Sequence, residues 1–317
     1  MATTTNITTT YAGEAAGKYV AAALLSANTI DKGGITVKPN IKYKEVLKKL
    51  SLDDIVKDAT CDFTATSTLT VTERVLAPEE FQVNLQLCKS DFASDWNAIE
   101  MGYSAHDNLP KSFSDFLIAH VAAKVAAKNE TNLWSGVTAN AGEFDGFEVI
   151  MTTAAAQPAA QEILGTTLSA ANIIAEARSV ISAVPTALYG QPDLKLYMPQ
   201  SAVLFYIQAL GGFGASGLGA NGIQGMGTQW YTDGSLSLDG IPIFMANGMS
   251  ADTMICTTTE NLCFGTGLMS DSQEIKIIDM ADLDGSKNVR VVMRFSAGCQ
   301  IVNVEDVVTY GIVNASN

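Results

Sequence analysis

The chain has 317 residues, of which 47% are hydrophobic and only 16% are charged, and its formal net charge is −14. So few charged residues indicate that much of the surface is covered by other subunits, the alternative being a large monomer with a single core. The acidic balance argues against tight, charge-driven binding of nucleic acid, which requires clustered lysine and arginine. The longest apolar runs, such as 19–25, are too short to cross a membrane, so we expect no membrane segment.

The first segments of the chain are predicted to be loose and then helical. Residues 1–12 are rich in threonine, and residues 13–28 are rich in alanine and predict a short helix. Residues 43–50 predict a second, lysine-rich helix with an apolar stripe that contains Val46 and Leu50. A solvated charged face is the favoured interpretation of its lysines, and a nucleic-acid site is the alternative.

Residues 61–71 and 81–87 each alternate between apolar and polar side chains, which is typical of strands with one buried face. The turn-rich segment 72–80 separates them, so the pattern predicts a long two-stranded hairpin. Both apolar faces fall on odd positions, and the matching register sets Phe63 opposite Leu87. A lone hairpin is marginally stable in water, so its apolar face needs a cover on its own domain or on a neighbouring subunit.

The best helix candidate is Lys111–Trp134. Ser112 followed by Asp115 is typical of an N-terminal cap, apolar residues recur at helical spacing, and Gly136 ends the segment. Charged side chains, Glu130 among them, predict a solvent-exposed side. The helix would be roughly 35 Å long, the width of a small domain, which favours a spine on which other layers are mounted.

The second half of the chain predicts alternating helices and strands. A short strand is expected at Phe147–Met151, followed by a helix that Ser169 caps and Pro185 ends, a strand at Leu194–Met198 and a helix at Ser201–Leu210. Asp284-Gly285 is predicted to form a hairpin turn between two later strands. The later strands are expected at 241–245, 254–257, 275–280, 289–295, 299–304 and 307–313.

The cysteines predict neither a disulfide framework nor a zinc site. Their number is odd, and no CxxC motif occurs, so reduced thiols in a reducing compartment are expected. The hairpin register places Cys61 and Cys88 on opposite faces, which predicts that these two are not bonded. The five cysteines are Cys61, Cys88, Cys256, Cys263 and Cys299.

No set of residues typical of catalysis occurs. Gly212, Gly214 and Gly217 have the dinucleotide-binding spacing, but they follow a predicted helix rather than a strand, so a ligand-independent loop is the favoured interpretation. His120 lies among apolar residues of the long helix, as expected of a core or interface histidine. We therefore expect no enzymatic activity, no cofactor and no metal, although carboxylate sites leave no local signature.

The order of the C-terminal motifs is the most specific feature of the sequence. Gly240-Ile241-Pro242 opens an apolar segment, Leu262-Cys263-Phe264-Gly265 follows, and a pair of strands ends in Arg294-Phe295-Ser296-Ala297-Gly298. Together with the long hairpin and the long helix, this order resembles the tailed-phage major capsid proteins of the Hong Kong ninety-seven fold. The resemblance extends over nearly the whole chain from about residue 13.

The resemblance implies an α+β fold with four parts. They are an N-terminal arm and lead-in, 1–57; an extended loop in the form of a β-hairpin, 58–92; a peripheral domain, 93–154 and 266–296, with the spine helix 111–134; and an axial domain, 155–265 and 297–317. The implied subunit-interface residues are Phe63, Leu69, Val71, Arg74, Phe81, Val83, Leu85 and Leu87. The implied axial-loop residues, near the five-fold and six-fold axes, are Gly212, Gly214, Gly217 and Gly219.

The resemblance also implies a function. The chain would be a structural protein of the virion, assembled in the host cytoplasm into pentamers and hexamers of an icosahedral shell around double-stranded DNA. Portal and scaffolding proteins would be its partners. Because the segment 72–80 holds Arg74 but no lysine, the shell would lack the covalent cross-link of some relatives. The alternatives are the shell protein of an encapsulin compartment and a cytosolic nucleotide-dependent enzyme that uses Gly212–Gly217.

Overall fold

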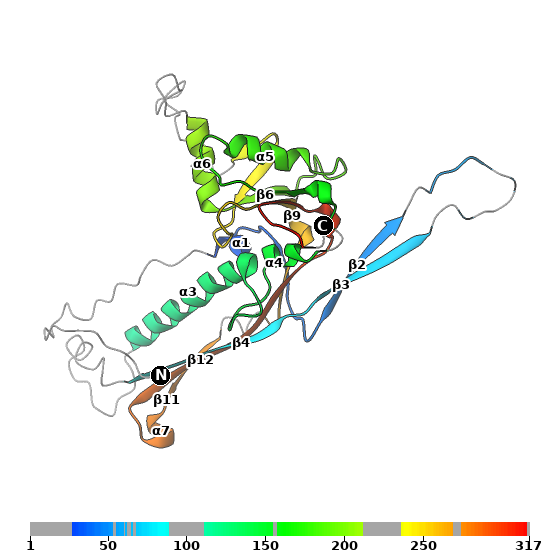
Figure 1. Cartoon of the computed structure of the whole chain (residues 1–317). Helices are drawn as coiled ribbons and strands as arrows, with labels where there is room; N and C mark the ends of the chain where they lie inside the picture. Colours follow the sequence, from blue (N-terminus) through cyan, green and yellow to red (C-terminus); the bar gives the residue numbers. More distant parts are fainter. Residues whose placement is uncertain are drawn as a thin grey trace.

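The computed structural model describes residues 27–52, 55–59, 61, 65, 68–88, 111–154, 157–211, 236–268 and 274–315. These residues form a body with two main sheets and a two-stranded hairpin that extends away from it (Figure 1). Residues 13–26 of the predicted helix 13–28 and the glycine-rich loop that begins at Gly212 lie outside the described residues.

The first sheet has five strands in the order β1-β10-β12-β11, with β4 paired along the other side of β12. The long helix α3 covers one of its faces, where Leu117 and Val121 pack against Val291. Alternate positions of β12 are buried because only this face is covered. The elements are β1 (Thr36–Lys38), β4 (Glu79–Cys88), α3 (Lys111–Ser135), β10 (Leu262–Thr266), β11 (Ile275–Asp279), α7 (Ala281–Asp284) and β12 (Asn288–Ile301).

The second sheet has six strands in the order β5-β13-β9-β6-β8-β7. Helices α5 and α6 pack on one face of it, and a second core on its other face contains Trp134 from α3 and Tyr197 from β6, whose ring centroids lie 5.3 Å apart. That second core joins the two sheets. The elements are β5 (Glu162–Ile163), α5 (Ile173–Ser182), β6 (Leu194–Met198), α6 (Gln200–Gly211), β7 (Ser237–Leu238), β8 (Ile241–Met245), β9 (Met254–Thr258) and β13 (Val308–Tyr310).

Short elements complete the junction. They are α1 (Asn28–Asp31), α4 (Phe147–Thr152) and the 3-10 helices η1 (Ala159–Gln161), η4 (Thr259–Asn261) and η6 (Val304–Asp306). Glu130 on α3 is buried, not exposed as predicted, because α1 folds over it: the Thr29 amide donates to Glu130 Oε2 at 3.2 Å, and the Thr29 hydroxyl donates to the same carboxylate. Trp134 Nε1 donates to Thr29 Oγ1 at 2.9 Å.

The predicted hairpin of 61–71 with 81–87 is wrong. Strand β3 (Leu69–Leu76) pairs with β2 (Glu45–Leu52), and β4 pairs with β12, with Leu87 opposite Val289. Alternation shows that a strand has one buried face but does not name its partner. Ala77 and Pro78 separate β3 from β4, and the two strands pair with different partners instead of with each other.

Two further local predictions are wrong. The segment Tyr43–Leu50 is mostly strand β2 rather than a helix, because its spacing of Val46 and Leu50 fits both periods and pairing with β3 decides the outcome. The predicted strand Phe147–Met151 is helix α4, which starts after Gly146 in extended conformation.

The other helices and strands largely confirm the sequence patterns. Helices α3, α5 and α6 and strands β6, β8, β9 and β11 lie where they are predicted, within a few residues. The two strands expected at 289–295 and 299–304 form the single strand β12, and the last strand is shorter than predicted. Gly285 ends α7 in the left-handed conformation, with φ 69°, in the predicted turn between β11 and β12. None of the five cysteines forms a disulfide, so Cys61 and Cys88 are not bonded to each other, as predicted.

Candidate subunit interface

The β2–β3 hairpin has one almost entirely apolar face. Antiparallel pairing sets Leu50 opposite Val71 and Leu52 opposite Leu69, and the Lys48–Glu73 pair is the only charged one on this side. Side chains on alternate positions share a face, so these residues form one surface. We call it the apolar hairpin face; it consists of Val46, Leu50, Leu52, Leu69, Val71 and Val75.

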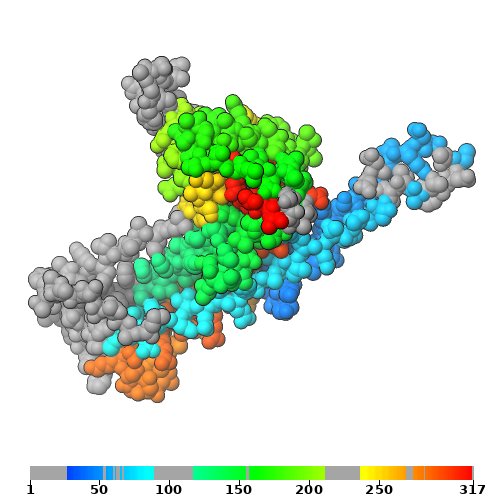
Figure 2. Space-filling view, in the orientation of Figure 1, coloured from blue at the N-terminus to red at the C-terminus, as the bar shows by residue number. Residues whose placement is uncertain are grey.

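The apolar hairpin face is open to solvent in the single chain. Leu50 is 67% exposed, Leu52 58%, Leu69 54% and Val71 56%. The hairpin reaches away from the body in the space-filling view (Figure 2). Burying one such side chain completely is worth about 1.5–3 kcal/mol, and exposed apolar patches of this kind mark sites of protein association.

The root of the hairpin is held by its opposite face. Leu47 and Leu76 are buried against Ile41 and Cys263 in a small core of their own. Gly265 lies beside this core, where a Cβ atom would come within 2.8 Å of Ile41 Cδ1. This packing attaches the hairpin to β10 of the body.

Polar contacts fix the direction of the hairpin root. Arg74 Nη2 donates to Gln300 Oε1 at 3.1 Å, and burial lowers the pKa of Arg74. Lys49 Nζ lies 2.8 Å from Asn303 Oδ1 and 2.7 Å from Glu305 Oε2. Because Lys49 and Arg74 lie on the face opposite to the apolar one, these contacts turn the apolar hairpin face outward.

The predicted interface residues divide into four groups. Leu69 and Val71 lie on the apolar hairpin face, Arg74 lies on the opposite face, and Phe63 is outside the described residues. The remaining four are on β4 in the first sheet. Of these, Phe81 packs on Phe295 with ring centroids 5.7 Å apart.

The other β4 positions take part in the packing under α3 to different degrees. Val83 and Leu87 pack against the core that α3 forms with β12, so they stabilise the body. Leu85 remains 39% exposed. The sequence prediction missed the β2 half of the apolar hairpin face, although Val46, Leu50 and Leu52 alternate with polar residues as expected of a strand.

The glycines expected near the symmetry axes, Gly212, Gly214, Gly217 and Gly219, lie outside the described residues; helix α6 ends at Gly211, just before them.

The prediction of a shell without covalent cross-links depends on a loop tip at 72–80 that contains no lysine. Residues 72–80 instead belong to β3, β4 and the two residues between them. Lys57 lies on the segment that connects β2 to β3, so the loop does contain a lysine.

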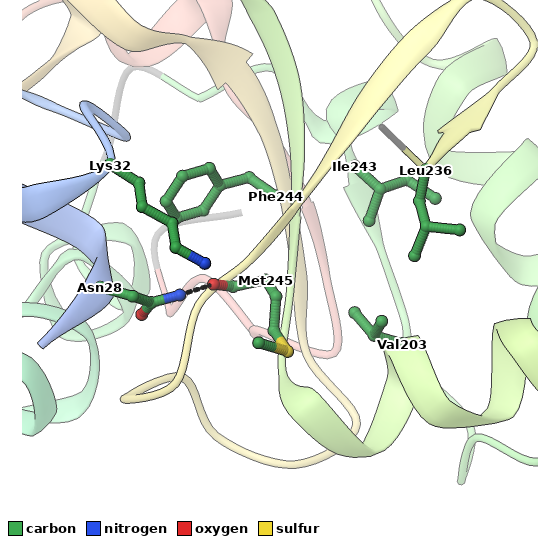
Figure 3. A pocket seen from close by; sticks show the side chains of 7 residues that line it. All are labelled: Asn28, Lys32, Val203, Leu236, Ile243, Phe244 and Met245. Atoms are coloured by element: carbon green, nitrogen blue, oxygen red, sulfur yellow. Dashed lines mark hydrogen bonds between the residues drawn. The ribbon is translucent and has the colours of Figure 1, made fainter. Parts of the chain in front are cut away.

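A cavity of about 280 Å³ lies where α1 meets the second sheet (Figure 3). Val203 of α6 and Ile243 of β8 line its apolar side, and Asn28 and Lys32 line the other. Asn28 Nδ2 donates to the Met245 carbonyl. Of the described residues, only Lys32 brings an ionisable side chain to this lining, so these residues supply no acid–base pair there.

Two buried carboxylates serve structure. Burial raises the pKa of Glu148, which accepts hydrogen bonds from the Ser250 amide at 2.8 Å and from the hydroxyls of Ser250 and Thr253. Burial likewise raises the pKa of Glu130. Among the described residues, no group of three or more His, Cys, Asp or Glu could hold a metal ion. None of the helices in the described ranges is long and apolar enough to cross a membrane.

Comparison with known structures gives the fold a context. A chain from the capsid of a native GTA particle computed with C5 symmetry superimposes with a TM-score of 0.64 at 12% identity, covering 93% of each chain. The fold is that of a phage capsid protein. A chain from the capsid of Myoviridae phage XM1 gives a TM-score of 0.58 at 12% identity, covering 93% of this chain and 94% of that one. A chain of Mycobacterium phage Adephagia gives 0.53 at 15% identity, covering 93% and 91%.

The capsid fold is conserved here in three dimensions without detectable sequence similarity. No protein-family model and no curated protein matches the chain. The matches extend over nearly the whole chain. Within this fold, the apolar hairpin face exposes a group of aliphatic side chains that a partner could bury.

Proposed function

We propose that this chain is the major capsid subunit of a tailed bacteriophage. Copies of it associate into pentamers and hexamers of an icosahedral shell that encloses double-stranded DNA, and the protein resides in the virion. One observation carries the proposal: an outward-facing apolar surface is held at a fixed angle on a hairpin that the body leaves uncovered. A subunit with such a surface buries these apolar side chains against a second copy of itself.

The parts of the chain receive roles that differ from the sequence expectation. The extended loop is the β2–β3 hairpin with its connecting segment, 45–76, rather than 58–92. The first sheet and α3 form the peripheral domain, and the second sheet with α5 and α6 forms the axial domain. The structural role requires no catalytic site, and portal and scaffolding proteins are the further partners that we propose.

Two alternatives are less well supported. The shell protein of an encapsulin compartment would also self-associate. The similar solved structures, however, include the capsids of a GTA particle and of phage XM1, which supports the phage alternative. A nucleotide-dependent enzyme would need its glycine motif to follow a strand, whereas Gly212 follows helix α6.

The substitution Leu50→Asp tests the proposal, with Thr70→Asp as the matched control. Both residues are exposed on the hairpin, but Thr70 lies on the opposite face, beside Ser51. A carboxylate on the apolar hairpin face would have to be desolvated in the contact, so Leu50→Asp should give folded single protomers. Thr70→Asp should still assemble.

The readouts are electron microscopy and sedimentation of purified protein. Shells, rings or sheets should form from the parent chain and the Thr70→Asp variant, and not from the Leu50→Asp variant. Normal shells from Leu50→Asp would overturn the role of the hairpin. Isolated particles from the parent chain at every concentration and salt would overturn the proposed function itself.

A further inference from the structure

An apolar groove runs between α3 and the first sheet and opens beside α1. Its volume is about 310 Å³, enough for a few aliphatic side chains. Small or apolar side chains form most of its walls, and its two ionisable groups are Asp31 and the buried Glu130. The residues that the argument uses are Ala27, Ile30, Ala122, Ala126, Met293 and Phe295.

The described part of the chain begins at the rim of this groove. Ala27 is the first described residue and lines the groove itself. Its position is fixed by its neighbours, since Asn28 donates to the Met245 carbonyl and Thr29 is hydrogen-bonded to Glu130 at the groove wall. The described chain therefore begins beside this groove, at Ala27.

The sequence just before Ala27 suits an apolar groove. Residues 19–25 read YVAAALL, the most apolar run in the first 26 residues. Leu24 and Val20 stand three and seven positions before Ala27 in the sequence, the spacing at which residues share one face of a helix, and Leu25 is out of that spacing. This spacing gives a stripe of two aliphatic side chains in line with one that already lines the groove.

We propose that the groove is the docking site for the segment 19–25 of the same chain, with Val20 and Leu24 inserted between α3 and β12. The tether decides between this occupant and a second copy. Leu24 is three residues from Ala27 and so at most about 11 Å from it. A segment held by so short a link has an effective concentration in the millimolar range, which a separate molecule at ordinary concentration does not match.

Thiol labelling tests the docking on the full-length chain. The probe is Ala126→Cys in the groove, in a background with Leu50→Asp to keep protomers single and Cys61→Ser to remove the exposed native thiol. Adding Leu24→Asp should raise the rate of maleimide labelling at position 126 about tenfold, because a buried leucine is replaced by a charge. Adding Leu25→Asp, the matched control, should change it less than about twofold.

A cross-linking measurement identifies the occupant without relying on that variant. Leu24→Cys combined with Ala126→Cys, treated with a short bis-maleimide, should give a cross-link within one chain, seen as a protein of monomer mass with joined peptides. Equal labelling rates in the Leu24→Asp and Leu25→Asp variants would overturn the proposal. Cross-linked dimers in place of linked monomers would assign the groove to a second copy. Because single protomers are used, neither result depends on the proposed shell.

Discussion

Gly248 marks the place where the loop between β8 and β9 crosses the end of α3, and Gly248→Ala should strongly destabilise the protein. An added Cβ atom would lie 2.0 Å from the Glu130 carbonyl oxygen and 2.6 Å from its carbon. Both are backbone atoms of a helix, so relief requires the loop to move. The loop would then lose the hydrogen bond from its Gly248 amide to the Glu130 carboxylate and the 3.3 Å bond that the Ser135 hydroxyl donates to the Gly248 carbonyl.

These losses give the magnitude. Overpacking a tight site costs about 1–3 kcal/mol, and losing one hydrogen bond to a buried charged group costs about 1.5–3 kcal/mol more. We therefore expect Gly248→Ala to lower the free energy of unfolding by about 4 kcal/mol. Gly142→Ala is the control, because Gly142 has φ 79° with no atom near the added Cβ, so only backbone strain of about 1 kcal/mol applies.

Urea unfolding of single protomers carrying Leu50→Asp measures both changes through tryptophan fluorescence, to which the buried Trp134 contributes together with Trp96 and Trp230. The midpoint for Gly248→Ala should fall well below that for Gly142→Ala. Equal midpoints for the two variants would refute the reasoning, because the loop would then be free to move away from α3 at little cost. The junction between the two sheets would in that case be looser than its packing indicates.

Two further predictions concern buried ionisable groups. Because burial raises the pKa of Glu148, the folded state holds its proton to higher pH than the unfolded state, so this residue's contribution to stability falls as the pH rises from 4.5 through the raised pKa. Glu148→Gln can keep its bonds to Ser250 and Thr253 without titrating, so its unfolding free energy relative to the parent should increase between acidic and neutral pH; an unchanged difference would contradict this. Burial also raises the pKa of Cys256 to about 12, whereas Cys61 is exposed. A thiol reagent at neutral pH should label Cys61 in native protomers and reach Cys256 only after unfolding, and equal rates would contradict the burial of Cys256.

The sequence predicts those elements whose pattern is local. Helix α3 and strand β8 follow from periodicity, from Gly136 and from Gly240, all within a few residues of the element itself. Strand pairing is different, because the partner of β4 lies some 200 residues further along the chain. The alternation of Phe81, Val83 and Leu87 indicates a covered face, but it is equally consistent with cover by another strand, a helix or a second subunit.

The buried position of Glu130 could not be predicted for the same reason. A glutamate in an Ala-rich helix is normally solvated, and the residue that satisfies it, Thr29, lies 101 positions away. The apolar hairpin face shows the opposite case. Its two strands lie close in sequence. The sequence predicts Leu69 and Val71 on an apolar strand face, although with the wrong partner strand, and it misses Leu50 because the four-residue spacing of Leu50 from Val46 also fits a helix.

The orientation of the hairpin bears on the kind of assembly that we propose. If the hairpin could rotate about its root, two copies could pack their apolar hairpin faces against each other and form a closed dimer. Its root is instead fastened to the body by the Leu47–Leu76 core and by the contacts of Lys49 and Arg74. A fixed, projecting surface that lies on the body of the next copy makes a heterologous contact, and repeated heterologous contacts close into rings. Pentamers and hexamers then differ only in the angle between neighbours, which a contact made of exposed aliphatic side chains can accommodate better than one made of directional hydrogen bonds.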